Sequence, residues 1–218
     1  MPRSPALPPA RRIPGTRRDA REWAAQILFE LDAASRGASA DPNALDLGLV
    51  FEDFWELQYR LRLEEEGLDS DEVQAAFERD DWRDLVAERA AREFCESIVE
   101  GVTEHLGEID AALQRVSDHW ALDRMGGIER SVLRMGAYEL LYRADEVPRP
   151  VAINEAIDVC KYFGMRESAH FVNGLLDQIA HRVAGTRSPA RIAPENGQET
   201  SPPADSADGE TWSPTASA

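Results

Sequence analysis

The stretch that decides the fold reads VAINEAIDVCKYFG at residues 151–164 and AHFVNGLLDQIAHRVAG at residues 169–185, with MRES between them. In each half, apolar residues recur at intervals of three and four, which places them on one face of an α-helix. The short break predicts an antiparallel helical hairpin, and each helix must bury its apolar face against further helices. Inside the second helix, Asn173-Gly174 costs roughly 1 kcal/mol relative to alanine. This pair therefore predicts a close helix approach or a buried hydrogen bond.

The same periodicity continues through most of the chain. Further helices are expected at residues 17–35, 44–65, 82–106, 108–120 and 128–145, with a short acidic one at 71–80. No stretch alternates apolar and polar residues as a half-buried strand does. The sequence therefore predicts an all-α fold of about seven helices.

Composition divides the chain into three parts. Residues 1–16 are rich in proline and arginine, and residues 186–218 are rich in proline, serine, alanine and acids without periodicity. Both ends are predicted to be disordered, because neither can bury enough apolar surface to offset the entropy of ordering. The ordered domain is expected to span residues 17–185 and to contain an acidic insertion at about residues 40–90.

The charge is strongly polarised along the chain. The net charge of −17 argues at first against a nucleic acid as partner. However, residues 1–21 carry six arginines against one aspartate, while residues 52–93 carry fifteen acids against six arginines. Because salt screens exposed charges beyond about 8 Å, a basic arm can bind RNA while a distant acidic surface has little effect.

Cysteine usage and hydropathy indicate the compartment. Cys95 and Cys160 both lie on apolar helical faces and form no disulfide framework, which favours a reducing environment. No apolar run approaches the roughly 20 residues of a membrane span, and the N-terminus lacks the apolar centre of a secretory signal. A cytoplasmic protein is expected, although the arginine-rich start is also compatible with a transit peptide.

The sequence offers no catalytic or metal site. The four histidines lack ligand spacing with the cysteines or with one another, and no glycine-rich loop follows a strand. No serine or cysteine stands in a nucleophile motif. We therefore expect a protein that is not an enzyme and that holds no cofactor or metal.

The arginine arm is the best candidate for a binding function. The arginines of this arm lead directly into the first helix, and this helix could extend backwards when the arm binds RNA. They are Arg11, Arg12, Arg17, Arg18 and Arg21. Arginine suits RNA because its planar group binds phosphate bidentately and stacks on bases. An ordinary unstructured basic tail is the alternative reading.

Five segments together carry a family resemblance. They are RRDAREWAAQILFELD, FCESIVEGV, IERSVLRMGAYELLY, VPRPVAINEAIDVCKYFG and SAHFVNGLLDQIA, and VAINEA and FVNG are their most specific parts. In this order they resemble the NusB family of transcription antitermination factors. The resemblance covers about residues 11–31 and 92–183. It implies two small helical bundles packed across each other.

The resemblance also implies a function and a site. Family members bind the single-stranded boxA element of nascent ribosomal RNA together with NusE, a small-subunit ribosomal protein, and associate with RNA polymerase. The family's arginine-rich motif falls on the five arginines above. A second RNA-facing region falls on the turn of residues 145–149, which includes Glu146 and Arg149, with Lys161 one helix further. Family members are monomers or homodimers.

This sequence departs from the family pattern in three places. Ile13-Pro14-Gly15-Thr16 splits the basic arm into two groups, the acidic insertion looks long, and the acidic tail is not a family feature. One alternative is a helical protein-interaction module that has lost RNA binding and uses its acidic surface for a basic partner. Another is an enzyme, because NusB-like domains also precede ribosomal RNA cytosine methyltransferases. No nucleotide-binding strand–loop–helix follows here, which disfavours the enzyme.

Overall fold

The computed structural model describes residues 15–37, 46–65, 67, 70–78, 82–117 and 122–185. The predicted disordered arm, apart from Gly15 and Thr16, and the predicted C-terminal tail lie outside these residues. So does the part of the acidic insertion between residues 38 and 45.

Within the described residues the chain forms only helices, so the predicted all-α class is confirmed. Over the described ranges, nine α-helices and one 3-10 helix follow one another in this order: α1 (Arg17–Gly37), α2 (Leu47–Glu65), α3 (Ser70–Phe77), α4 (Trp82–Val86), α5 (Arg89–Glu104), α6 (Leu106–Val116), η2 (Leu122–Arg124), α7 (Gly127–Tyr142), α8 (Arg149–Tyr162) and α9 (Ser168–Gly185). None of the described helices is both long enough and apolar enough to cross a membrane.

The single helix predicted at residues 82–106 is wrong, because the structure divides it into α4 and α5 and assigns Leu106 to α6. The break lies at Ala87 and Glu88, where Glu88 has the extended backbone of an N-cap residue. The end of α4 is held from outside, because Arg62 of α2 donates a hydrogen bond of 2.7 Å to the carbonyl oxygen of Leu85. This contact depends on tertiary structure, so the periodicity of the segment could not predict the break.

The predicted hairpin is confirmed in α8 and α9, which pack against each other. Pro148 is the N-cap of α8 and Pro150 lies in its first turn. Gly164 ends this hairpin helix with a φ of 78°, and the Met165 amide donates 2.9 Å to the carbonyl of Cys160. This is the Schellman geometry that only glycine adopts without strain.

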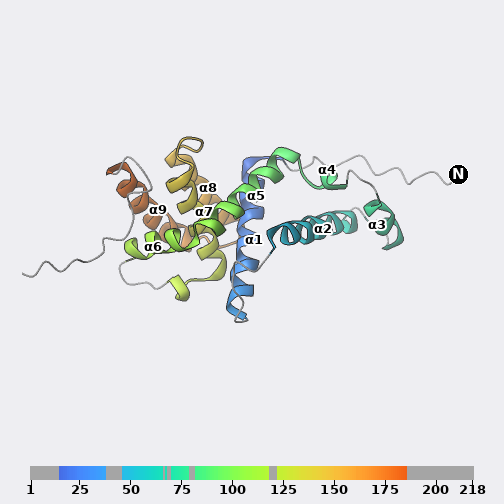
Figure 1. Cartoon of the computed structure of the whole chain (residues 1–218), viewed down its shortest axis with the longest axis horizontal. Coiled ribbons are helices and arrows are strands. Elements are labelled where there is room, and N and C mark those ends of the chain that lie inside the picture. The colour runs from blue at the N-terminus through green and yellow to red at the C-terminus, as the bar shows by residue number, and fades with distance from the viewer. Residues whose placement is uncertain are drawn as a thin grey trace, which may run out of the picture.

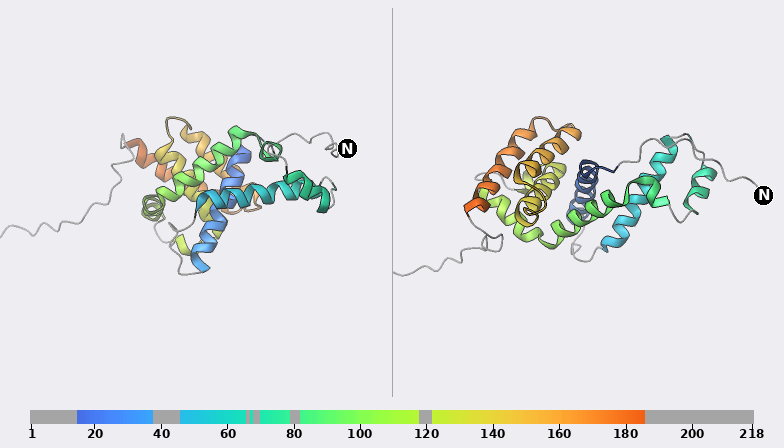
Figure 2. Two further views of the ribbon diagram at one scale, coloured as in Figure 1. Left: turned by 45° about the vertical axis from the view of Figure 1, so that its right-hand side comes forward. Right: turned by 90° about the horizontal axis from the view of Figure 1, so that it is seen from above.

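The helices form two groups with α1 between them. Helices α6, α7, α8 and α9 pack on one side, and α2, α3 and α4 extend on the other, while α5 runs across both (Figure 1). Seen from above, α1 stands in the middle of the molecule (Figure 2). It packs on α5, α7 and α8, so its course decides where the N-terminal arginines lie.

Two buried ion-pair clusters fasten α1 to α7. Near its start, Arg21 donates to the Glu139 carboxylate at 2.7 Å, and these residues are 2% and 0% exposed. Further along the helix, Asp32 accepts hydrogen bonds from Arg130 and Arg134. Arg130 also donates to the carbonyl oxygens of Leu122 and Met125, so its donors are used inside the protein.

The close helix approach occurs at a glycine other than the one predicted. A Cβ at Gly136 of α7 would lie 2.7 Å from a methyl carbon of Leu176, so glycine permits α7 and α9 to approach there. Gly174 is exposed, and a Cβ there would meet nothing within 4 Å. The predicted approach at Gly174 is therefore wrong, and Asn173 instead donates a part-buried hydrogen bond of 3.1 Å to Asp177.

Removing one member of the buried Arg21–Glu139 pair should be costly. Replacement R21M leaves the Glu139 carboxylate buried without its cation, and we expect it to lower the free energy of unfolding by about 3–5 kcal/mol. Urea unfolding at pH 7 measures this loss. The double replacement R21M/E139L should recover most of it, because no buried charge remains. A loss below about 1 kcal/mol for R21M alone would contradict the anchoring role.

Candidate nucleic-acid interface

The start of α1 is held by a reciprocal cap. The Asp19 carboxylate accepts hydrogen bonds from the backbone N–H groups of Gly15 and Thr16 at 3.1 and 2.8 Å. In return, the Asp19 amide donates to the hydroxyl of Thr16 at 3.1 Å. Such a cap satisfies amides that the helix leaves free, and it holds Gly15 and Thr16 at the start of α1.

Arg17 and Arg18 point to different sides of α1, because successive residues on a helix are turned by about 100°. Arg17 lies over the ring of Phe94 on α5, with 4.7 Å from its guanidinium carbon to the ring centroid. Arg18 instead reaches α8, where it pairs with Glu155 and Asp158. The two neighbouring arginines therefore belong to two separate surfaces.

The first surface gathers three arginines around one aromatic ring. The guanidinium carbons of Arg17, Arg21 and Arg143 lie 4.7, 5.2 and 4.9 Å from the Phe94 centroid. Beside the ring lies a surface groove of about 320 Å³, lined by Gly15, Arg17, Ala90, Ala91, Glu93, Phe94, Ser97 and Arg143. Cation–π contacts of this kind hold guanidinium planes in place. We call this surface the Phe94 groove.

Arg143 is oriented by two further partners. It donates a hydrogen bond of 2.8 Å to the hydroxyl of Ser97 and another of 2.6 Å to Glu146. The hydrogen bond from Arg143 lowers the pKa of Glu146 below its usual value. Glu146, one of the predicted site residues, is thus the exposed partner of a largely buried arginine of the groove.

The second surface lies on α8. Arg18 donates 3.1 Å to Glu155 and 2.7 Å to Asp158, and Lys161 donates 2.9 Å to the same Asp158. Arg18 and Lys161 were both predicted to face RNA, and the structure brings them together through this shared carboxylate. We call these four side chains the α8 cluster.

The structure describes two of the four remaining predicted site residues, Arg21 and Arg149. Arg11 and Arg12 lie outside the described residues. Arg149 is half-buried at the first position of α8. Arg21 is buried against Glu139 and has no surface to offer an RNA, so we assign it the structural role of holding α1 on α7.

Two residues of the Phe94 groove were not predicted from the sequence. Arg143 follows the last turn of α7, two residues before the turn of residues 145–149 that was predicted to face RNA. Its acidic partner Glu146, three positions later, was a sequence signal that could have pointed to it. Phe94 gave no signal of a site in the sequence, because an aromatic residue on a helix is usually part of the core, and it is only 8% exposed. Its contact with arginines from α1 and from the end of α7 arises only from the packing of three helices.

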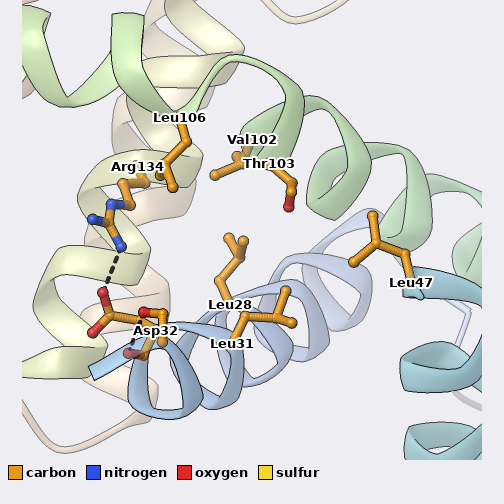
Figure 3. A pocket seen from close by; sticks show the side chains of 9 residues that line it. Leu28, Leu31, Asp32, Leu47, Val102, Thr103, Leu106 and Arg134 are labelled. Atoms are coloured by element: carbon orange, nitrogen blue, oxygen red, sulfur yellow. Dashed lines mark hydrogen bonds and ion pairs between the residues drawn. The ribbon is translucent and has the colours of Figure 1, made fainter. Parts of the chain in front are cut away.

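An apolar cavity of about 70 Å³ lies elsewhere, between the C-terminal half of α1 and the junction of α5 and α6. Leu28, Leu31, Val102, Leu106 and Leu47 line it, and Arg134 and Asp32 bond to each other at its wall (Figure 3). Its polar groups already have partners within the protein. Among the described residues, no group of histidine, cysteine and carboxylate side chains could hold a metal ion.

Comparison with known proteins identifies the family. A sequence model of the NusB family matches residues 54–181. The chain is 40% identical to the transcription antitermination protein NusB of Myxococcus xanthus over 166 residues, which is 76% of this chain and 95% of the relative. The chain belongs to the NusB family. The resemblance found in the sequence is thereby confirmed.

Other relatives and solved structures agree with this family. The NusB protein of Geobacter sp. strain M21 is 33% identical over 77% of this chain and 96% of its own length. The structure of NusB from T. maritima aligns with a TM-score of 0.54 and 27% identity, covering 78% of this chain and 93% of that one. NusB proteins are antitermination factors and not enzymes, as expected for this chain.

A complex of antitermination factors NusB and NusE with double-stranded RNA is a further structural neighbour. It aligns with a TM-score of 0.51 at 22% identity, over 76% of this chain and 96% of that one. At this identity the likeness concerns the fold of the NusB chain.

Glu22 makes the stability of the α1 start dependent on pH. Partial burial, together with the nearby Asp19 charge, raises the pKa of Glu22 to about 7. Because the folded state holds this proton more tightly than the unfolded chain, the native protein loses stability as pH rises from about 4.5 to 7. Replacement E22Q should therefore change little at pH 5 and stabilise by about 1 kcal/mol at pH 8, after allowance for solvent screening.

Urea unfolding of wild type and E22Q at pH 5 and pH 8 tests this expectation. The matched control is E64Q, which neutralises an exposed carboxylate on α2. An equal gain for E22Q at both pH values would contradict the raised pKa.

Proposed function

We propose that this protein is a non-catalytic RNA-binding adaptor of transcription antitermination. It binds the boxA element of nascent ribosomal RNA together with a NusE-type ribosomal protein, and the assembly associates with RNA polymerase. It acts in the cytoplasm, as a monomer or a homodimer. Membership of the NusB family supports this proposal, as does a structural neighbour in which NusB is bound to NusE and RNA.

The observation that carries the proposal is the Phe94 groove. It offers two guanidinium groups, from Arg17 and Arg143, at the point where the basic arm joins α1. Each group is planar and permanently charged, so it binds phosphate bidentately or stacks on an exposed base. Among the described residues, the carboxylate that pairs with Arg143 is that of the exposed Glu146, and an incoming phosphate can take its place on the guanidinium.

Salt screening limits how far the acidic remainder of the protein opposes this role, although Glu93 lines the groove itself. The exposed acids of α2 lie in the group of helices on the far side of α1 from α8 and α9 (Figure 2). At physiological salt their field is screened within about 8 Å. The RNA therefore responds mainly to the charges that line the groove and the arm.

Removing the two groove arginines should weaken RNA binding and flatten its salt dependence. For the double replacement R17A/R143A we expect the affinity for a short boxA-type RNA to fall about tenfold or more. The slope of log affinity against log salt should fall by about 1.4, since each phosphate contact on a single strand contributes about 0.7. Titration of labelled RNA at several salt concentrations, with and without the NusE-type protein, measures both.

The matched control is R60A/R83A, which removes two positive charges at α2 and α4, where both arginines pair with glutamates. An equal loss in the control would indicate a general charge effect and would contradict a site at the Phe94 groove.

A second candidate function is a protein-interaction module without RNA binding. It is favoured by the exposed face of α2, where Leu57 and Leu61 are 47% and 46% exposed beside Asp53 and Glu64. An apolar strip with acidic neighbours suits a basic protein partner. If the NusE-type protein binds equally well without RNA and with R17A/R143A, while no RNA binds, this second function is the correct one.

A further inference from the structure

Arg18 is held by two carboxylates that both belong to α8. Its Nε and Nη2 atoms donate to the two oxygens of Glu155 at 3.3 and 3.1 Å, and Nη2 also donates to Asp158 at 2.7 Å. The second oxygen of Asp158 accepts from Lys161 at 2.9 Å. Glu155 also lies 3.7 Å from the buried Arg21.

The two acids are fixed more firmly than the arginine. Their side chains are 20% and 34% exposed, whereas the Arg18 side chain is 49% exposed. Glu155 is further held near Arg21, and Asp158 is bonded to Lys161 of its own helix. In any separation, Arg18 is therefore the group that moves away, while the carboxylates stay on α8.

The contacts that Arg18 makes are those that a phosphate would make. The Nε and Nη2 atoms of Arg18 each donate to one oxygen of the same acid. Arginine binds carboxylate and phosphate in this same bidentate way. The hydrogen bond from Lys161 and the nearby Arg18 charge lower the pKa of Asp158. This carboxylate thus stays charged at neutral pH and keeps competing for the guanidinium.

We propose that Glu155 and Asp158 act as phosphate surrogates that hold Arg18 in the RNA-free protein, so that RNA gains this arginine only by displacing it from α8. This inference rests on the proposed RNA-binding function. At the Phe94 groove the competition is weaker, since the largely buried Arg143 pairs with a single carboxylate among the described residues, that of the exposed Glu146. An RNA bound at the groove therefore has to compete with two carboxylates for Arg18, and in the wild-type protein this arginine adds little net affinity.

The pairing of Arg18 with Glu155 and Asp158 lowers the affinity of the free protein for any RNA. Removing the two carboxylates should therefore raise that affinity. We expect E155Q/D158N, which keeps side-chain size, to bind a boxA-type RNA about fivefold more tightly than wild type at low salt. A scrambled RNA of the same length should gain at least as much. The salt slope should steepen by about 0.7, the amount expected for one additional phosphate contact.

The matched control is D53N/E64Q, which removes two negative charges from the exposed face of α2. It leaves Arg18 paired, so its RNA affinity should stay near that of wild type. Replacement R18A completes the test. It should change wild-type affinity little, but it should abolish the gain in the E155Q/D158N background. Circular dichroism and thermal unfolding verify that each variant is folded.

Several outcomes would overturn the inference. If E155Q/D158N binds no more tightly than wild type while wild type binds RNA, the acids do not compete with phosphate. If E155Q/D158N binds more weakly, the acids position Arg18 for RNA and do not withhold it. An equal gain in RNA affinity for D53N/E64Q would show that the gain comes from the change in net charge and not from the release of Arg18. If neither wild type nor R18A binds RNA under any condition, the proposed function itself fails.

Discussion

The attachment of α1 to α7 through buried ion pairs is the constraint on which the rest of the structure depends. Arg21 pairs with Glu139 near the start of α1. Towards the end of the same helix, Asp32 pairs with Arg130 and Arg134. An isolated buried charge costs several kcal/mol, whereas a paired one with all its hydrogen bonds does not. Apolar packing can slide by one turn at moderate cost, but these pairs tolerate only one register. The rotation of α1 about its own axis is therefore fixed.

That fixed rotation decides what the N-terminal arginines can do. With Arg21 turned towards α7, helical geometry directs Arg17 to Phe94 and Arg18 to α8. Three arginines within one turn and a half of helix thus have three different roles. One is an internal anchor, one lies at an open groove, and one is paired with acids on a neighbouring helix. The arginines of one basic segment therefore differ in how available they are for binding a ligand.

Sequence patterns predicted the helices well wherever local interactions determine them. The hairpin of α8 and α9 follows from apolar spacing, from two prolines at its start and from Gly164, whose positive φ ends α8. The division between α4 and α5 was not predicted in this way, and it is accompanied by a contact from another helix, in which Arg62 donates to the carbonyl of Leu85. The close approach at Gly136 was also missed, since it depends on Leu176 of α9.

The sequence by itself determined the helical class, the family and the presence of a basic arm, because periodicity, turn residues and charge are local properties of the chain. Only the tertiary structure decided which charges are available at the surface. Burial and pairing depend on residues more than a hundred positions apart, as in Arg21 with Glu139 and Arg18 with Glu155. A linear charge count cannot distinguish an arginine that anchors the core from one that faces solvent, since only packing sets the partner and the exposure of each group.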